Sequence, residues 1–165
     1  MSGTRLFEAI DALVADWRAI TGYGAPSESG VIAVYDGPSE TGTAPASYVV
    51  VGGRSPWADE DADETAGTTD AEWNSLPITG GSQRESLSIP CAVVAESGSA
   101  EWSTLRTSVK NILDDLDAAL RTASGLGDMS QQIVLTFNNG RLTQSAGPDG
   151  VAVAFEFDVN LTILN

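Results

Sequence analysis

The sequence predicts a single α+β domain in which two amphipathic helices cover one face of a mostly antiparallel sheet. Three patterns lead to this fold class. Two segments carry apolar residues at helical spacing, short runs rich in β-branched residues end at turn residues, and the C-terminal segment alternates apolar and polar residues. The chain has 165 residues, of which 42% are hydrophobic, and no clear internal boundary, so we expect one domain spanning 1–165.

The first predicted helix spans Leu6–Ile20. Its apolar residues recur at alternating spacings of four and three, which places them on one stripe: Leu6, Ile10, Leu13, Trp17 and Ile20. We expect Thr4 to be the N-cap, with Glu8 in the first turn, where a negative charge suits the helix dipole. Gly22 and Gly24 are expected to end the helix.

The second predicted helix spans Trp102–Leu120 and carries the longer apolar stripe. Its members are Trp102, Leu105, Val109, Ile112, Leu116 and Ala119. Burial of each large side chain contributes about 1.5–3 kcal/mol, so this helix should anchor the core. We therefore expect the substitution Leu116→Asp to leave the protein insoluble or unfolded.

Three strands are predicted between the helices. Two short β-branched runs, Val31–Tyr35 and Tyr48–Val51, stop at glycine-containing turns. A third strand, Ser86–Ala95, alternates around Cys91, which falls in the inward phase. Because Pro90 has no N–H to donate, we expect this strand to lie at an edge or to carry a bulge.

The C-terminal third is predicted to be all β. Two strands, Ile133–Phe137 and Arg141–Thr143, are separated by an expected turn at 138–140, and a second turn follows at 147–150. The segment Val151–Ile163 then alternates without a miss, which predicts one buried and one hydrated face. It is longer than an ordinary strand, so part of it should project as an arm or pair with a neighbour.

An acidic insertion, Arg54–Ser82, lacks periodicity and is predicted to be a long solvated loop. Asp59, Asp61 and Asp63 alternate as calcium ligands do. However, Glu64 stands where a calcium loop of the EF-hand type needs glycine, so a solvated loop is favoured and no metal is assigned.

Four residues are candidates for contact with a partner protein. Trp57 and Trp73 bracket the acidic insertion, and they either mark a protein contact site or pin the loop ends to the domain. Glu156 and Asp158 share the predicted hydrated face of the last strand. A catalytic carboxylate pair is disfavoured there, because no aromatic platform for a sugar lies nearby in the sequence.

The composition argues against several other classes of function. The chain has no histidine, which removes the commonest general base and metal ligand, and we expect no enzyme activity and no cofactor. A net charge of −15 repels DNA and anionic membranes. No signal peptide or apolar span is evident, so we expect a soluble protein made in a cytoplasm.

The size and element order resemble the tail terminator proteins of long-tailed, siphovirus-like bacteriophages. The likeness covers nearly the whole chain: the helix Leu6–Ile20, the strands and mid-chain loop, the helix Trp102–Leu120 and the long C-terminal β-hairpin. The family has no short diagnostic motif to compare, and the insertion Arg54–Ser82 is longer than its pattern.

The resemblance implies a hexameric ring at the tail–neck junction of the virion, built from protein made in the host cytoplasm. Such a ring caps the tail tube, stops its polymerisation and joins it to the head or neck connector protein. DNA would pass through its centre without specific binding. Alternatives are a head–tail connector, a tail-tube subunit and, from another class, a metal- or ligand-binding module built on the acidic loop.

Overall fold

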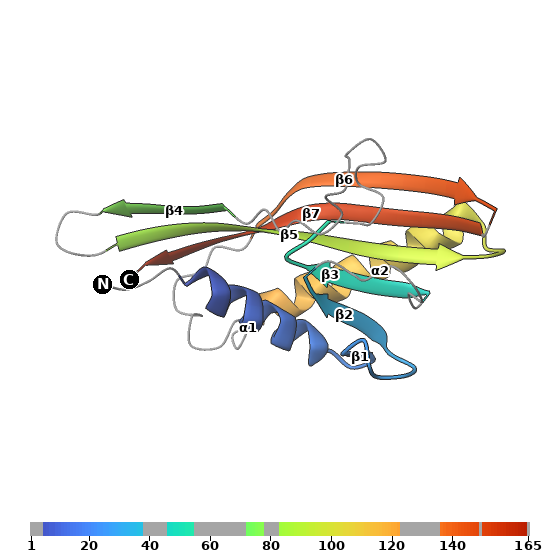
Figure 1. The fold of residues 1–165 in the computed structure, drawn as a ribbon, viewed down its shortest axis with the longest axis horizontal. Coiled ribbons are helices and arrows are strands. Elements are labelled where there is room, and N and C mark those ends of the chain that lie inside the picture. The colour runs from blue at the N-terminus through green and yellow to red at the C-terminus, as the bar shows by residue number, and fades with distance from the viewer. Residues whose placement is uncertain are drawn as a thin grey trace.

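The computed structural model describes residues 5–37, 46–54, 72–77, 83–122, 136–148 and 150–164 (Figure 1). For 72–77, 83–84, 136–139 and 163–164 it describes the backbone only. The elements run in the order α1 (Leu6–Arg18), β1 (Tyr23–Gly24), β2 (Ile32–Asp36), β3 (Ser47–Val51), β4 (Glu72–Pro77), β5 (Gln83–Ser97), α2 (Trp102–Arg121), β6 (Thr136–Gly147) and β7 (Gly150–Leu164).

The seven strands form one mixed sheet. Its order is β1-β2-β3-β5-β7-β6, and β4 also pairs with β5, on the side of β5 that β3 occupies further along. The neighbours β1, β2 and β3 are parallel, and all other pairs are antiparallel. The α+β class and the mostly antiparallel sheet predicted from the sequence are therefore confirmed.

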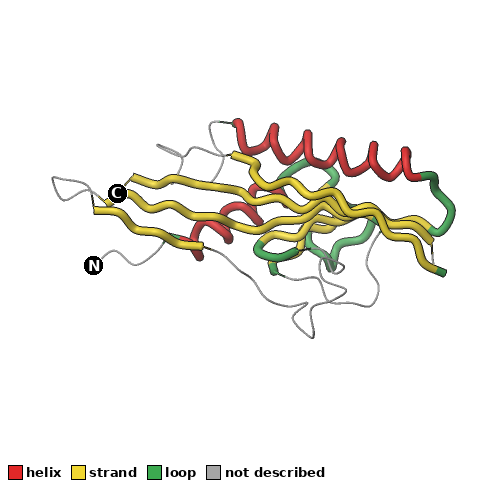
Figure 2. Tube along the Cα trace, turned by 90° about the horizontal axis from the view of Figure 1, so that it is seen from above, coloured by secondary structure: helices red, strands yellow, loops and turns green. Residues whose placement is uncertain are grey.

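Both helices pack on one face of this sheet. Val51, Cys91 and Phe157 stand in register on adjacent strands, so their side chains share a face. They belong to one core cluster with Leu13 and Leu116 of the two helices, and we call this the helix-covered face. Figure 2 shows α2 running along this side of the sheet.

The centre of the core lies between α1, α2 and β7. Trp17 and Phe157 are fully buried, with ring centroids 6.4 Å apart. Leu116, from the predicted apolar stripe of α2, is also fully buried. Each such side chain stabilises the fold by about 1.5–3 kcal/mol.

The helix bounds follow the predicted stripes closely, but the ends of α1 differ. Its N-cap position is held by Arg5 and not by Thr4. It stops at Arg18, whose guanidinium donates two hydrogen bonds to the Val34 carbonyl, at 2.8 and 3.1 Å. That contact fixes the end of α1 against β2, two residues before the predicted Ile20.

The strand β5 is central, although Pro90 led us to expect an edge or a bulge. β4 pairs with β5 as far as Ser88, and β3 begins to pair at Cys91, so Pro90 faces the gap between them. The Pro90 carbonyl accepts a hydrogen bond from the Gly53 N–H at 3.0 Å, on that same side. The N–H and C=O of a strand residue point to the same side of the strand. The N–H that Pro90 lacks would therefore point into the gap between β4 and β3, where no neighbouring strand offers an acceptor.

The expected turn at residues 138–140 is instead part of a continuous strand. β6 runs from Thr136 to Gly147, and its pairing with β7 shifts register between Asn138 and Arg141. A bulge therefore absorbs the extra residues without reversing the chain. A Cβ at Gly140 would lie 2.4 Å from the Phe155 ring, so a larger residue there requires this ring to move.

The acidic insertion is not wholly a loop, because β4 lies within it. Residues 72–77 pair with β5 in register, from Glu72 opposite Ser88 to Pro77 opposite Gln83. Cross-strand backbone pairing overrides a local sequence that shows no strand periodicity.

Neither helix in the described part of the chain is long and apolar enough to cross a membrane.

Candidate assembly interface

Three strands project from one end of the domain as an arm. It consists of β4, the first half of β5 and the last residues of β7, which pair side by side over residues 72–77, 84–88 and 160–164. In Figures 1 and 2 these strands extend past the start of α1, and the C-terminus lies beside them. The last strand was expected to project past the sheet, but it pairs with β5 over 151–164, and what projects beyond the helices is the end of the sheet itself (Figure 1).

A buried carboxylate ties the base of the arm to α1. Glu85 of β5 is only 4% exposed, and its Oε1 accepts a hydrogen bond from the backbone N–H of Arg5 at 2.9 Å. Arg5 is the N-cap residue of α1, so the carboxylate meets the positive end of the helix dipole. A residue 80 positions away in the chain thus supplies the cap that Thr4 was expected to give.

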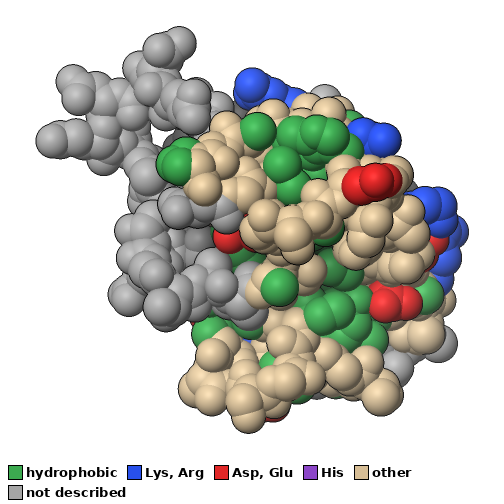
Figure 3. All heavy atoms as spheres, turned by 90° about the vertical axis from the view of Figure 1, so that its right-hand side faces the viewer, with side chains coloured by type: hydrophobic (Ala, Val, Ile, Leu, Met, Phe, Trp, Pro, Cys, Tyr) green, Lys and Arg blue, Asp and Glu red, His purple; other side chains and the backbone are tan. Residues whose placement is uncertain are grey.

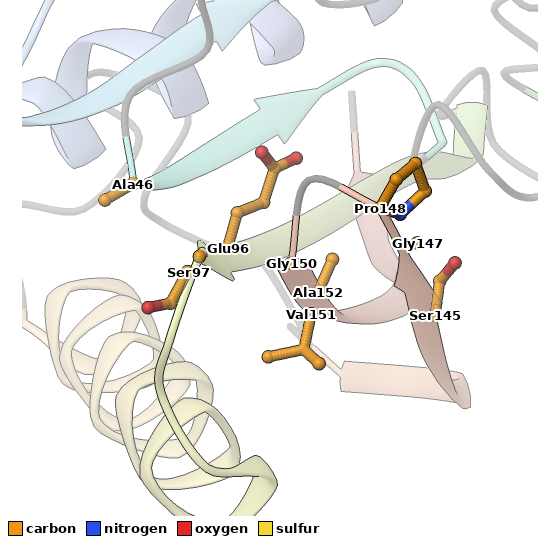
Figure 4. A pocket seen from close by; sticks show the side chains of 10 residues that line it. Ala46, Glu96, Ser97, Ser145, Gly147, Pro148, Gly150, Val151 and Ala152 are labelled. Atoms are coloured by element: carbon orange, nitrogen blue, oxygen red, sulfur yellow. The ribbon is translucent and has the colours of Figure 1, made fainter.

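The opposite end of the domain carries an open hollow of about 680 Å³ (Figure 4). Its floor is a row of residues across the sheet. The Glu96 N–H donates a hydrogen bond to the Ala46 carbonyl, and on its other side Glu96 pairs with Ala152, which pairs with Ser145. Three of these four side chains are small, which leaves room above the sheet.

The β6–β7 turn forms one wall of the hollow and is tightly packed. Gly150 has φ +132°, and a Cβ there would lie 2.3 Å from the Ser97 carbonyl oxygen, so only glycine fits. Figure 3 views this end of the molecule directly: hydrophobic side chains lie in patches across its middle, and Lys and Arg side chains lie towards its rim.

Glu96 is the acidic group of the hollow. In Figure 4 its carboxylate reaches out from β5 into the space between Ala46 and Pro148. Partial burial removes some of its hydration and raises its pKa above the usual value for a glutamate. In the described part of the chain it has no side-chain hydrogen bond or ion pair.

Glu156 and Asp158 do not form the hydrated face predicted for the last strand. They are 3% and 7% exposed, on the sheet face opposite the helices, which we call the opposite face. Asp158 pairs with Arg54 at 3.1 Å, and both carboxylates make further interactions within the chain. The hydrated face predicted at these two residues is therefore wrong, whereas their contact with a partner protein stays a prediction.

The middle of the opposite face is buried and apolar. Its buried cluster consists of Ala33, Tyr48, Val50, Ala92, Val94 and Ala154. Strict alternation along one strand predicts two faces but does not reveal whether the second face meets water. In the sequence, the polar residues of β7 indicated solvent, whereas the apolar residues of β3 and β5 in the same phase indicated burial.

The remaining candidates lie outside the described side chains. Asp59, Asp61, Asp63 and Trp57 fall in a segment that the structure does not describe, and only the backbone of Trp73 is described, within β4. Among the described residues, no group of three or more metal-ligating side chains comes together. The alternatives set out for these five residues therefore stay open.

The single cysteine is placed as the sequence predicts, in the core. Cys91 is fully buried on the helix-covered face, and burial raises the pKa of its thiol well above the usual range. A thiol held protonated and away from solvent is a poor nucleophile.

Sequence patterns assign no role to Glu85, Glu96 or Arg141. A signal existed for Glu85, which shares the inward phase of Leu87 and Ile89, where a charge needs a dedicated partner. Glu96 stood one residue beyond the predicted strand, and Arg141 stood beside an expected turn. Only the three-dimensional arrangement distinguishes these charges from ordinary surface ones.

A scan against protein-family models finds no match to this chain, and a search of curated proteins finds none that is significant. The geometry and the resemblance described above are therefore the basis for a function.

Proposed function

We propose that this protein is a structural subunit of a bacteriophage tail, a terminator that forms a ring, caps the tail tube and joins it to the head or neck. The observation that carries the proposal is the arm of β4, β5 and β7, which projects beyond the helix-covered body. A closed ring needs two different, complementary surfaces on each copy. An arm at one end and an open hollow at the other give each copy two different surfaces for contact with its neighbours.

Charge sets the conditions under which such a ring closes. Six copies at −15 each carry a total of −90. Contacts are favoured where carboxylates lie beyond a Debye length of about 8 Å, facing the lumen or the outside. Added salt screens this repulsion, so we expect ring assembly to strengthen from low to moderate salt. Assembly that weakens steadily as salt rises would contradict this expectation.

An acidic lumen also suits the passage of DNA. Binding to DNA depends on neutralising its phosphates with lysine and arginine, and this chain has only eight such residues against 23 acidic ones. DNA would therefore slide through such a ring without adhering to it.

Two related structural roles are distinguished by how the chain polymerises. A tail-tube subunit forms tubes without a fixed length, whereas a terminator stops at a ring. The two amphipathic helices, which supply much of the core, favour the terminator over a tube subunit richer in β-structure. A head–tail connector also stops at a ring, and binding to purified tail tubes separates it from a terminator.

The first experiment is negative-stain electron microscopy of the purified protein, with light scattering at low and moderate salt. Rings of one diameter with an open centre are the expected result. Tubes of unlimited length would replace the terminator by a tube subunit. A monomer at every concentration and salt would favour the binding module, and calorimetry with Ca²⁺ would test it, since no heat at millimolar ion excludes a calcium site.

A further inference from the structure

Arg141 stands apart from the other basic residues. The structure describes seven basic side chains, and six of them make a hydrogen bond or ion pair within the chain: Arg5, Arg18, Arg54, Arg106, Lys110 and Arg121. Arg141, exposed on β6, is the seventh and has no recorded partner among the described residues. Glu156 stands opposite Arg141 on β7, but no ion pair joins these two described residues, and Glu156 is buried whereas Arg141 is exposed.

Glu96 is its counterpart of opposite sign. It lies in the hollow, is partly buried, and has no polar side-chain contact in the part of the chain that the structure describes. A carboxylate that has lost hydration without gaining a partner is destabilising, and a guanidinium placed against it would remove that cost.

The two charges cannot satisfy each other within one copy. Both lie on the opposite face, because Glu96 is in register with Ala152 and Ser145, and Arg141 is four residues from Ser145 along β6. Four residues along a strand and two strands across amount to a separation of about 16 Å between Cα atoms. Side chains that stand roughly perpendicular to a sheet do not bridge that distance.

We propose that Arg141 of one copy enters the hollow of a neighbouring copy and forms an ion pair with Glu96 there. The inference rests on the proposed function, in that the ring supplies the second copy. The hollow has room for an arginine side chain, and the planar guanidinium can bind both oxygens of a carboxylate. Donor and acceptor lie at different places on each copy, so every copy uses both, either head to tail around a ring or twice in a two-fold dimer. The ring of the proposed function requires the first arrangement.

The position of Arg141 favours this contact. β6 ends the strand order, so Arg141 stands on a strand with only one partner, β7, among the described strands. The adjacent Leu142, which is 51% exposed, points to the helix-covered face, since it stands opposite Phe155. The side of β6 that faces away from the helices therefore presents Arg141 and not an apolar side chain.

The test is a pair of charge reversals, Glu96→Lys and Arg141→Glu, examined alone and mixed. Each variant alone places like charges in every contact, so we expect the dissociation constant for self-association to rise by at least about 30-fold. In an equal mixture, alternating copies face each other with opposite charges at every contact. We therefore expect the mixture to assemble with an affinity within about threefold of the wild type.

Two matched controls separate this contact from the general effect of charge. Asp11→Lys changes the net charge as Glu96→Lys does, and Lys110→Glu changes it as Arg141→Glu does. Both positions are exposed on the helices, away from the hollow. Sedimentation velocity over a range of concentrations, with electron microscopy, should show these controls assembling as the wild type does, apart from a uniform change caused by net charge.

The outcomes distinguish the inference from the function on which it rests. Wild-type rings that persist unchanged in both reversals would overturn the inference and leave the ring in place. The inference also fails if the two folded variants stay apart when mixed. A mixture that stops at dimers would retain the contact and overturn the ring. A wild type that stays monomeric to millimolar concentration would overturn both.

Discussion

The two ends of strand β5 hold the same residue type in opposite situations. Glu85, at the base of the arm, is 4% exposed and accepts a hydrogen bond from the N-cap of α1. Glu96, eleven residues further along, lies in the open hollow with no side-chain hydrogen bond in the described part of the chain. One strand therefore carries one carboxylate used by the fold and one left for a partner.

The difference shows how a structural charge is separated from a functional one. The two carboxylates differ in burial, since Glu85 is 4% exposed and Glu96 is only partly buried. They also differ in partners, because Glu85 accepts a hydrogen bond from a backbone N–H at the start of a helix, whereas Glu96 has no side-chain partner among the described residues. A carboxylate without an internal partner is retained in a protein when a function such as partner binding requires it, even though it lowers stability.

Both ends of β5 depend on the same hydrophobic core, so a substitution that disrupts this core should have the largest effect on stability. Leu116→Asp places a charge at a fully buried position of α2, which costs more than about 4 kcal/mol and should unfold the protein or make it insoluble. Asn111→Asp introduces the same residue on the exposed side of α2 and should be neutral. A soluble Leu116→Asp protein with a normal melting temperature by circular dichroism would contradict the core assignment.

The next effect concerns the satisfied carboxylate. Glu85→Ala removes the acceptor from the Arg5 N–H, at a cost of about 1–3 kcal/mol. For a chain of this size that corresponds to a melting temperature lower by about 3–10 °C, measurable by calorimetry. Glu85→Gln keeps an acceptor oxygen and loses only the charge, so it should be affected less. Equal losses in the two variants would show that the hydrogen bond contributes little.

The unsatisfied carboxylate predicts a smaller effect of opposite sign. The raised pKa of Glu96 means that the folded state holds this proton more tightly than the unfolded state. Its stabilising contribution is present at acid pH and is lost as pH rises through the raised pKa. Glu96→Gln should therefore raise the melting temperature at neutral pH by about 1 °C while weakening self-association. A clear fall in melting temperature would show that Glu96 is satisfied within the chain.

A thiol reagent should not modify the middle of β5 in the folded protein. Cys91 is fully buried midway between the two glutamates, and the pKa of its thiol is raised by burial. We expect no reaction with a thiol reagent under native conditions and one equivalent after denaturation. Rapid labelling of the native protein would mean that the central strand opens.

Sequence patterns predicted the helices and the two long strands well, because periodic apolar residues report which face meets the core. The stripe from Leu105 to Leu116 and the alternation from Val151 to Leu161 are local signals of this kind. β4 has no such signal, since its pairing partner is what makes it a strand. The bulge at 138–141 has the composition of a turn, and only the continuous partner strand β7 keeps it extended.

The candidate site was less predictable than the fold, for a related reason. Glu85 is explained by Arg5, 80 residues away, and Glu156 and Asp158 by a covered face that their own strand does not report. Arg141 and Glu96 are distinguished by what they lack, which no local pattern records. Long-range pairing therefore accounts for most of what the sequence alone left open.

The gap beside Pro90 has a mechanical consequence. The arm's outer strand β4 stops before β3 begins, so on that side no strand continues from the arm into the body. The ladder between β5 and β7 alone runs without interruption from the arm to the far hollow. Its hydrogen bonds lie across the strands, so a pull along the arm shears them all together and does not unzip them one by one. The arm therefore resists a pull along its strands, and beside Pro90 the sheet narrows to β5, β7 and β6, since β6 pairs with β7 there from Thr136 to Asn138.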